Sequence, residues 1–128
     1  MPASSLKSIL HLDVRFPGDD VAKLGEFELL VLLSILRQAD APFANRVRED
    51  LEENAGRRVT RGALYRTIDR LADKGFLTWK LDPTEVPERG GNPMRRLTVT
   101  ESGREAVRSA RDVLTTFFGS VRTELGGA

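Results

Sequence analysis

The chain has 128 residues, of which 20 are lysine or arginine, 19 are acidic and 40% are hydrophobic. This size and composition are typical of one globular domain with a modest core, and leave no room for a second domain. Because the chain has no cysteine, disulfides and thiolate metal sites are excluded. The apolar stretch from Leu29 to Leu36 is too short to span a bilayer, and the N-terminus lacks the pattern of a secretory signal. We therefore expect a cytoplasmic protein with no membrane partner.

The charges are sorted along the chain. Residues 19–56 hold four basic and nine acidic residues, whereas six basic and two acidic residues lie between 57 and 75. Of the 20 cations, 16 are arginines, whose guanidinium group suits phosphate oxygens and guanine edges. The basic segment is therefore either a surface for nucleic acid or an ordinary solvated helix face.

Two helices are predicted before residue 57. Residues 25–38 are apolar almost all round, which predicts a helix in the middle of the core. Residues 43–54 predict a second, amphipathic helix with its acidic residues, Asp50 among them, facing water, and Gly56 ends it. Residues 1–23 form a leader in which helical spacing gives way to alternation, so only part of it is expected to be helical.

A third, short helix is predicted between Thr60 and Gly75. Thr60 is placed to cap its N-terminus, and Gly75 stands where a left-handed residue ends a helix. Three apolar residues, Leu64, Ile68 and Leu71, repeat at the spacing of one buried face. The opposite side then carries Gly62, Arg66, Asp69, Arg70 and Asp73, with Tyr65 on the flank.

Two strands and a last helix complete the chain. Residues 76–81 and 94–100 alternate apolar and polar residues, which predicts two half-buried strands with Leu97 and Val99 facing the same way. The connector 82–93 holds three prolines and two glycines, so we expect a projecting flap and no tight turn. Thr100 is placed to cap a long helix with apolar residues every three or four positions.

Three helices followed by a hairpin predict a winged helix-turn-helix, a mainly α fold with a small β-hairpin. In this fold the third helix enters the major groove of DNA and the hairpin loop reaches the neighbouring backbone. We assign residues 24–100 to this DNA-binding domain and residues 101–128 to a long C-terminal dimerisation helix.

Four short motifs carry a resemblance to a known family. They are Thr60-Arg-Gly-Ala-Leu-Tyr, Leu71-Ala-Asp-Lys-Gly-Phe-Leu, Glu88-Arg-Gly-Gly and Val99-Thr-Glu-Ser-Gly-Arg. Over residues 24–114 the chain resembles the PadR-like family of winged-helix transcriptional regulators. It departs from the family pattern at Arg66, where members usually have proline or a small residue, and at Arg96-Leu97, where members often have an aromatic pair.

The resemblance implies a homodimer that binds operator DNA through both third helices and wings, often as a repressor released by a small ligand. The residues themselves identify neither such an effector nor a cofactor. Tyr65 either donates to a phosphate or finishes the edge of the core, and Arg70 either contacts DNA or pairs with a neighbouring acid. Trp79 either packs on its strand or lines a ligand cavity. The expected DNA-binding residues are Thr60, Arg61, Gly62, Tyr65, Arg66, Arg70, Arg89, Arg95 and Arg96.

The last helix is more apolar than a winged-helix core of about 100 residues needs. We expect its apolar stripe to form the dimer interface, through Val107, Ala110, Leu114, Phe117, Phe118 and Val121. The alternative is that this stripe packs on the chain's own core. A two-fold dimer presents its third helices to half-sites roughly 34 to 36 Å apart on a near-palindromic operator.

An enzyme is the class that the sequence supports least. The only histidine, His11, lies in the leader, and no glycine-rich phosphate loop precedes a helix. We therefore expect no catalytic residue and no metal site. The alternative left open is a winged helix that binds another protein and does not bind DNA.

Overall fold

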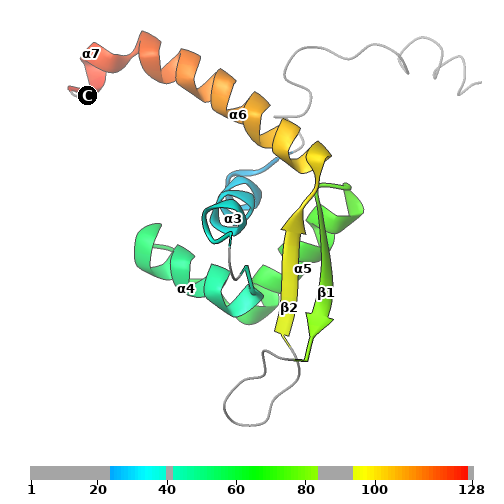
Figure 1. Cartoon of the computed structure of the whole chain (residues 1–128). Coiled ribbons are helices and arrows are strands. Elements are labelled where there is room, and N and C mark those ends of the chain that lie inside the picture. The colour runs from blue at the N-terminus through cyan, green and yellow to red at the C-terminus, as the bar shows by residue number, and fades with distance from the viewer. Residues whose placement is uncertain (1–23, 40–41, 84–93, 127–128) are drawn as a thin grey trace, which may run out of the picture.

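The computed structural model describes residues 24–39, 42–83 and 94–126. The expectations for the leader with His11, for Arg89 and for most of the flap therefore lie outside the described residues. The elements in chain order are α3 (Glu26–Arg37), α4 (Ala44–Asn54), α5 (Arg61–Asp73), β1 (Leu77–Asp82), β2 (Met94–Val99), α6 (Glu101–Ser120) and α7 (Arg122–Leu125). Figure 1 shows α3, α4 and α5 gathered beside a two-stranded hairpin, with α6 leading away from them. This is the predicted winged helix-turn-helix with a long C-terminal helix.

The three helices before the hairpin share one apolar core. The inner stripe of α5 is buried as predicted, with Leu64, Ile68 and Leu71 each no more than 1% exposed. Val31 and Leu32 of α3 and Val47 of α4 belong to the same cluster. Each of these side chains contributes about 1.5 to 3 kcal/mol when fully buried, so the apolar spacing fixes how α5 sits on α3 and α4.

The two ends of α5 are set by the residues that the sequence singled out. The Thr60 side chain accepts a hydrogen bond from the Ala63 amide at 3.1 Å, which satisfies one free N–H of the first turn. Gly75 follows the helix with φ of +81°, in the left-handed region that favours glycine. Both predicted helix ends are confirmed.

The hairpin is antiparallel and is held on both edges of β2. Leu77 lies opposite Val99 and Trp79 lies opposite Leu97 across the two strands. On the other edge, the Leu97 amide donates to the Pro42 carbonyl at 2.9 Å, and Phe43 pairs with Arg96 as an isolated bridge. The start of α4 is therefore fastened to the wing.

Helix α6 begins against the end of α5. The Thr100 hydroxyl donates to the Gly75 carbonyl at 2.7 Å and accepts from the Gly103 amide at 3.0 Å, so one side chain caps α6 and ties it to α5. A Cβ at Gly103 would lie 2.1 Å from the Phe76 carbonyl oxygen, which no side chain can avoid. Only glycine therefore fits at this crossing.

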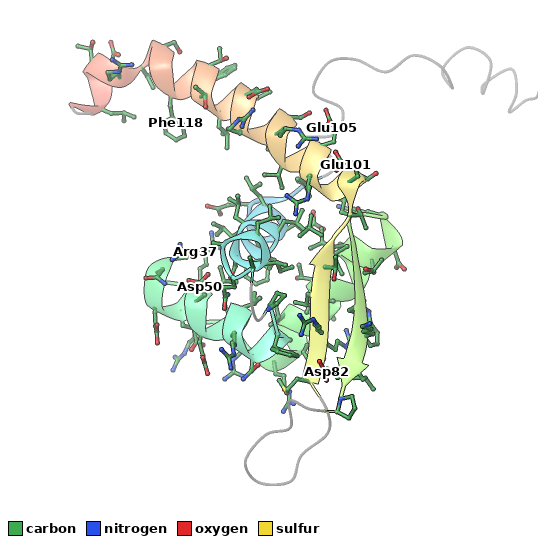
Figure 2. All side chains as sticks on the ribbon, viewed as in Figure 1. Arg37, Asp50, Asp82, Glu101, Glu105 and Phe118 are labelled. Carbon is green, nitrogen blue, oxygen red and sulfur yellow. The ribbon has the colours of Figure 1, made fainter. Side chains whose placement is uncertain are left out.

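Helix α3 is less uniformly apolar in its packing than its sequence suggests. Glu28 and Ser34 are buried, whereas Leu33 is 40% exposed. The expectation that Asp50 faces water is wrong, because Asp50 accepts a hydrogen bond from the Ser34 hydroxyl at 2.6 Å. This hydrogen bond lowers the pKa of Asp50 against the opposing effect of burial, and Asn54 and Arg37 lower it further. Figure 2 shows Arg37 and Asp50 meeting where α3 and α4 lie side by side.

The alternation predicted for β1 holds only at its base. Leu77 is buried, but Trp79 and Leu81 are 37% and 54% exposed. The outer end of β1 extends past the helices, so Trp79 and Leu81 have less core to pack against (Figure 1). The terminal helix also differs from the prediction, because it is interrupted at Val121, between α6 and α7. Within the described residues, no helix combines the length and apolar character needed to cross a lipid bilayer.

Candidate nucleic-acid interface

The N-terminal half of α5 presents two arginines to the outside. Arg61 and Arg66 are both exposed. Among the residues that the structure describes, neither of them forms an ion pair with a carboxylate. Unpaired guanidinium groups at a helix N-terminus lie next to free backbone N–H groups, and both favour an anion. This end of α5 is therefore cationic, with no counter-charge among the described residues.

Two small exposed residues accompany these arginines. Thr60 caps the helix, and Gly62 lies one turn before Arg66. A Cβ at Gly62 would lie 3.5 Å from Nη1 of Arg66, so the guanidinium group folds back along the bare backbone. Gly62 therefore leaves the backbone beside Arg66 without a side chain of its own.

Tyr65 is half-buried and packs against the core, so the second of its two predicted roles describes its ring. The guanidinium carbon of Arg95 lies 4.4 Å from the centre of that ring, and that of Arg61 lies 5.8 Å from it. These distances are typical of cation–π contacts. Tyr65 therefore connects the exposed arginine of α5 with an arginine of β2.

A cavity of about 190 Å³ opens beside this end of α5, between α4 and β2. Its polar lining comes from Asn45, Arg48, Arg61 and Tyr65, and its apolar lining from Ala44, Leu64 and Met94. The Asn45 side-chain oxygen is buried and has no hydrogen-bond partner among the described residues. A polar cavity with two guanidinium groups and a free acceptor suits an anionic ligand that also carries donors.

Sequence reasoning missed Asn45 and Arg48. Both stand in the segment 19–56, whose acidic balance hid its cations. The available signal was positional: Ala44, Val47 and Leu51 mark the inner side of α4, and Asn45 and Arg48 lie next to that stripe. Only the packing of α4 on α5 shows that they face Arg61.

The C-terminal half of α5 carries cations of a different kind. Glu28 of α3, with only 7% of its side chain exposed, accepts hydrogen bonds from Lys74 at 2.9 and 3.0 Å and lies 3.9 Å from Arg70. Burial raises the pKa of Glu28, but the hydrogen bonds from Lys74 and the Gly25 amide and the positive charge of Lys74 and Arg70 lower it below its usual value. Arg70 therefore pairs with an acid, one of the two alternatives expected, although the partner is Glu28 and not Asp69 or Asp73.

The arginines of the wing are also engaged. Arg95 pairs with Asp69 of α5 at 2.9 Å and has only 17% of its side chain exposed. Arg96 lies over the Phe43 ring and 3.7 Å from Asp82, with 40% of its side chain exposed. Trp79 packs under Arg95, with the guanidinium carbon 3.8 Å from the ring centre. The structure thus supports strand packing for Trp79, and Arg96 is the more accessible of the two wing arginines.

The residues expected at a dimer interface fall into two groups. Ala110 is 2% exposed and Val107 is partly buried, so both already pack within the chain. The remaining four are exposed, as are two apolar neighbours, one on α6 and one on α7. This apolar surface consists of Val113, Leu114, Phe117, Phe118, Val121 and Leu125. Figure 2 shows Phe118 far along α6, away from the helical body.

Comparison with known proteins places this fold. No family model and no curated protein matches the chain. Among solved structures, a PadR-like transcription factor from Bacteroides fragilis matches with a TM-score of 0.61 at 20% identity, over 80% of this chain and 92% of that one. A PadR family transcriptional regulator from Eggerthella lenta has a TM-score of 0.57 at 17% identity, over 98% of this chain and all of that one. MarR has a TM-score of 0.53 at 24% identity, over 98% of this chain and 89% of that one.

These matches show a fold shared with winged-helix regulators. The structures matched include PadR-like regulators, as the four sequence motifs indicated. At these identities the similarity concerns the arrangement of the backbone, and the roles of individual side chains have to be argued from this chain's own geometry.

Proposed function

We propose that the protein is a homodimeric transcriptional regulator that binds double-stranded DNA with α5 in the major groove. The observation that carries this proposal is the pair of exposed arginines, Arg61 and Arg66, at an end of α5 that has no counter-charge among the described residues. An exposed arginine that has no carboxylate partner among the described residues gains strongly from a phosphate or a guanine edge.

The neighbouring residues fit distinct parts of a duplex. Arg66, beside the bare backbone of Gly62, is placed to reach a base edge, and Thr60 brings the first turn of α5 close to a phosphate. At the cavity between α4 and α5, the guanidinium groups of Arg48 and Arg61 are placed to hold a backbone phosphate, whose oxygens only accept hydrogen bonds and so do not pair with the Asn45 oxygen. In this proposal Tyr65 contributes through its hydroxyl, because its ring is already packed.

The wing contributes less uniformly than the sequence suggested. Arg89 and Arg96 are proposed to contact the DNA backbone, Arg96 because 40% of its side chain is exposed. Arg70 is proposed as a weak contact, since Glu28 offsets its charge. Loss of a backbone contact should lower affinity for every DNA sequence to a similar degree.

A second copy of the chain is proposed to cover the outer half of α6. Phe117 and Phe118 are 63% and 60% exposed, and a contiguous apolar patch of this kind is costly for a monomer in water. Because α6 is fastened to α5 through Thr100, pairing two copies along α6 also places two α5 helices in a fixed relation. We expect half-sites roughly 34 to 36 Å apart on a near-palindromic operator.

We also propose that the protein acts in the cytoplasm. Within regulation we propose repression, because a dimer bound to an operator obstructs transcription by occupancy alone. A reporter gene tests this role when its promoter carries the operator sequence obtained by selecting bound duplexes from a random pool. Expression should fall when the protein is supplied and recover with a variant that no longer binds. A rise in expression would instead indicate activation.

The central experiment measures binding to a random duplex and to selected sequences at several salt concentrations. Each phosphate neutralised makes the slope of log affinity against log salt concentration more negative by about 0.9, so affinity should fall steeply as salt rises. Selection from a random pool should return a motif with two related halves. Absent or salt-insensitive binding would defeat the proposal and favour a winged helix that binds another protein.

The dimer is tested with Phe117→Glu, which places a charge in the centre of the apolar surface. Sedimentation should show a monomer, and operator binding should be lost with the dimer, because one half-site offers too little interface. Thr115→Glu is the matched control, since Thr115 is exposed on another side of α6. An intact dimer in the Phe117 variant would exclude this interface.

A further inference from the structure

One arginine of the wing joins three elements. The guanidinium group of Arg95, in β2, lies between two aromatic rings, 3.8 Å from the ring centre of Trp79 in β1 and 4.4 Å from that of Tyr65 in α5. Its Nη1 also donates to Asp69 of α5 at 2.9 Å. Arg61 extends the series, with its guanidinium carbon 5.8 Å from the Tyr65 ring. Rings and cations therefore alternate from the hairpin to the N-terminal turn of α5, in the order Trp79, Arg95, Tyr65, Arg61.

The arrangement uses what an arginine can offer. A planar guanidinium group has two faces for aromatic rings and an edge with donors for a carboxylate, whereas a lysine ammonium is a compact point charge. Arg95 contacts both rings and Asp69 at once, and only 17% of its side chain is exposed. A phosphate would have to displace Asp69 or a ring to reach it.

We propose that Arg95 is a positioning residue for DNA recognition: it fixes the angle between the wing and α5 and, through Tyr65, orients Arg61, without itself contacting DNA. The inference rests on the proposed function, because it names how that same DNA surface acquires its sequence preference. It differs from the expectation from the sequence, in which Arg95 was one of the residues that contact DNA.

The proposal follows from the position of the contacts on α5. Arg61, Tyr65 and Asp69 stand four residues apart, so they form one stripe along the side of α5 that faces the hairpin. Arg95 holds two of these three residues. When it is removed, α5 keeps its buried stripe and its cap, but the hairpin loses its main polar hold on that side. The helix then still offers cations to phosphates while its contacts to base edges lose their alignment.

The test compares the wild type with Arg95→Ala on two duplexes, the selected operator and a random sequence, over a range of salt concentrations. A positioning role predicts at least about tenfold loss of affinity for the operator and less than about threefold loss for the random duplex, with an unchanged salt slope. A phosphate contact predicts equal losses on both duplexes and a slope smaller by about one. The second pattern would overturn the inference while leaving the proposed function intact.

Two further variants separate the roles by sign and by rescue. Asp69→Asn removes a negative charge from the DNA side of the protein, so simple electrostatics predicts tighter binding to every duplex. The positioning role predicts weaker operator binding, because Arg95 loses its partner. Arg95→Lys keeps the charge and should rescue a phosphate contact, but it should not restore operator preference, because an ammonium lacks the planar faces and the fork of donors that hold two rings and Asp69 together.

Trp79 supplies a spectroscopic measurement that does not depend on DNA. It is the only tryptophan of the chain, so its fluorescence reports directly on the group stacked against it. Arg95→Ala should shift Trp79 emission, whereas Lys80→Ala, which removes an exposed cation from the same strand as Trp79, should leave it unchanged. Unaltered emission in the Arg95 variant would mean that the stack does not exist in solution.

The outcomes stay distinct if a variant is unstable or if the parent does not bind. Asp69 is 56% exposed in its side chain, so Asp69→Asn should fold and carries the test if Arg95→Ala does not. A wild type that binds no duplex at any salt concentration overturns the proposed function and this inference together. Binding by the wild type with parallel losses in the Arg95 variant overturns this inference alone.

Discussion

The two halves of α5 carry similar numbers of basic residues and use them in opposite ways. At the N-terminal half, Arg61 and Arg66 are exposed and unpaired among the described residues. At the C-terminal half, Lys74 and Arg70 are held by the buried carboxylate of Glu28. A count of charges along the sequence cannot distinguish these halves, because the acid that neutralises the second half comes from α3.

The helix dipole sharpens this contrast. Cations are stabilising at the C-terminus of a helix, where Lys74 lies, and unfavourable at the N-terminus, where Arg61 lies. Arg61 therefore costs the free protein some stability, which the Thr60 cap offsets in part. The cations of the C-terminal half of α5 hold the fold together, whereas in the proposed function those of the N-terminal half bind an anion from outside. The predictions below separate these two roles.

Gly103→Ala should have the largest effect, because it disrupts the crossing of α6 with the C-terminal end of α5. The added Cβ would meet the Phe76 carbonyl oxygen at 2.1 Å, and a backbone atom cannot rotate away. We expect the free energy of unfolding to fall by at least about 3 kcal/mol, measured by urea titration. Gly119→Ala is the matched control, because a Cβ there meets nothing within 4 Å. Equal stability of the two variants would mean that α6 does not cross the end of α5 this closely.

Glu28→Gln should loosen the same half by removing the negative charge beneath it. Lys74 then loses its buried partner, which costs about 1 to 3 kcal/mol of unfolding free energy. Glu26→Gln provides the comparison, since the side chain of Glu26 is 75% exposed and its ion pair with Arg57 is accessible to solvent. A Glu28 variant as stable as the Glu26 variant would show that the anchor contributes little.

Glu28 also predicts a pH dependence of stability. Its pKa is lowered in the folded chain from an ordinary value of 4.5, so the stabilisation is fully present above pH 4.5 and is lost as the pH falls through the lower folded value. The wild type should lose its advantage over Glu28→Gln in that acid range. Urea titrations of both proteins at several pH values check this, and a constant difference would argue against a charged Glu28.

Arg66→Ala tests the N-terminal half of α5, and it should change DNA binding without changing the stability of the fold. Loss of a base contact should weaken operator binding by about 1 to 3 kcal/mol and relax the preference at one position. The melting temperature should stay within about 1 °C of the wild type, because Arg66 has no internal partner among the described residues. Unchanged operator affinity would place Arg66 outside the contact surface.

Arg70→Ala should have the smallest effect and gives the closest comparison with Arg66, one turn away on the same helix. Because Glu28 already offsets its charge, we expect operator affinity to change by less than about 0.5 kcal/mol. Isothermal titration of both variants with the same operator gives the difference directly. A loss as large as that of Arg66→Ala would remove the distinction between the two halves.

The fold followed from local patterns, because caps, glycines and apolar spacing act over a few residues. Thr60, Gly75 and Thr100 each stand where the sequence placed them, and the order of elements then selects the winged helix. The partners of the arginines did not follow. Glu28 lies in a helix that the sequence showed as apolar almost all round, yet it accepts a hydrogen bond from Lys74, 46 positions away. Asp69 accepts a hydrogen bond from Arg95, 26 positions away. Only the tertiary packing decides which cations are left for a ligand.

The hydrogen bond from Thr100 to the Gly75 carbonyl bears on the distance between the two half-sites of an operator. In the proposed dimer, this hydrogen bond couples each α6 to its own α5, so the angle at which the two α6 helices cross sets the relative orientation of the two copies of α5. Changes along the outer surface of α6 would then alter the permitted separation of the half-sites, although they lie far from any base. The spacing of the half-sites that the dimer accepts would then be determined by α6, a helix that in the proposed complex does not enter a groove of the DNA.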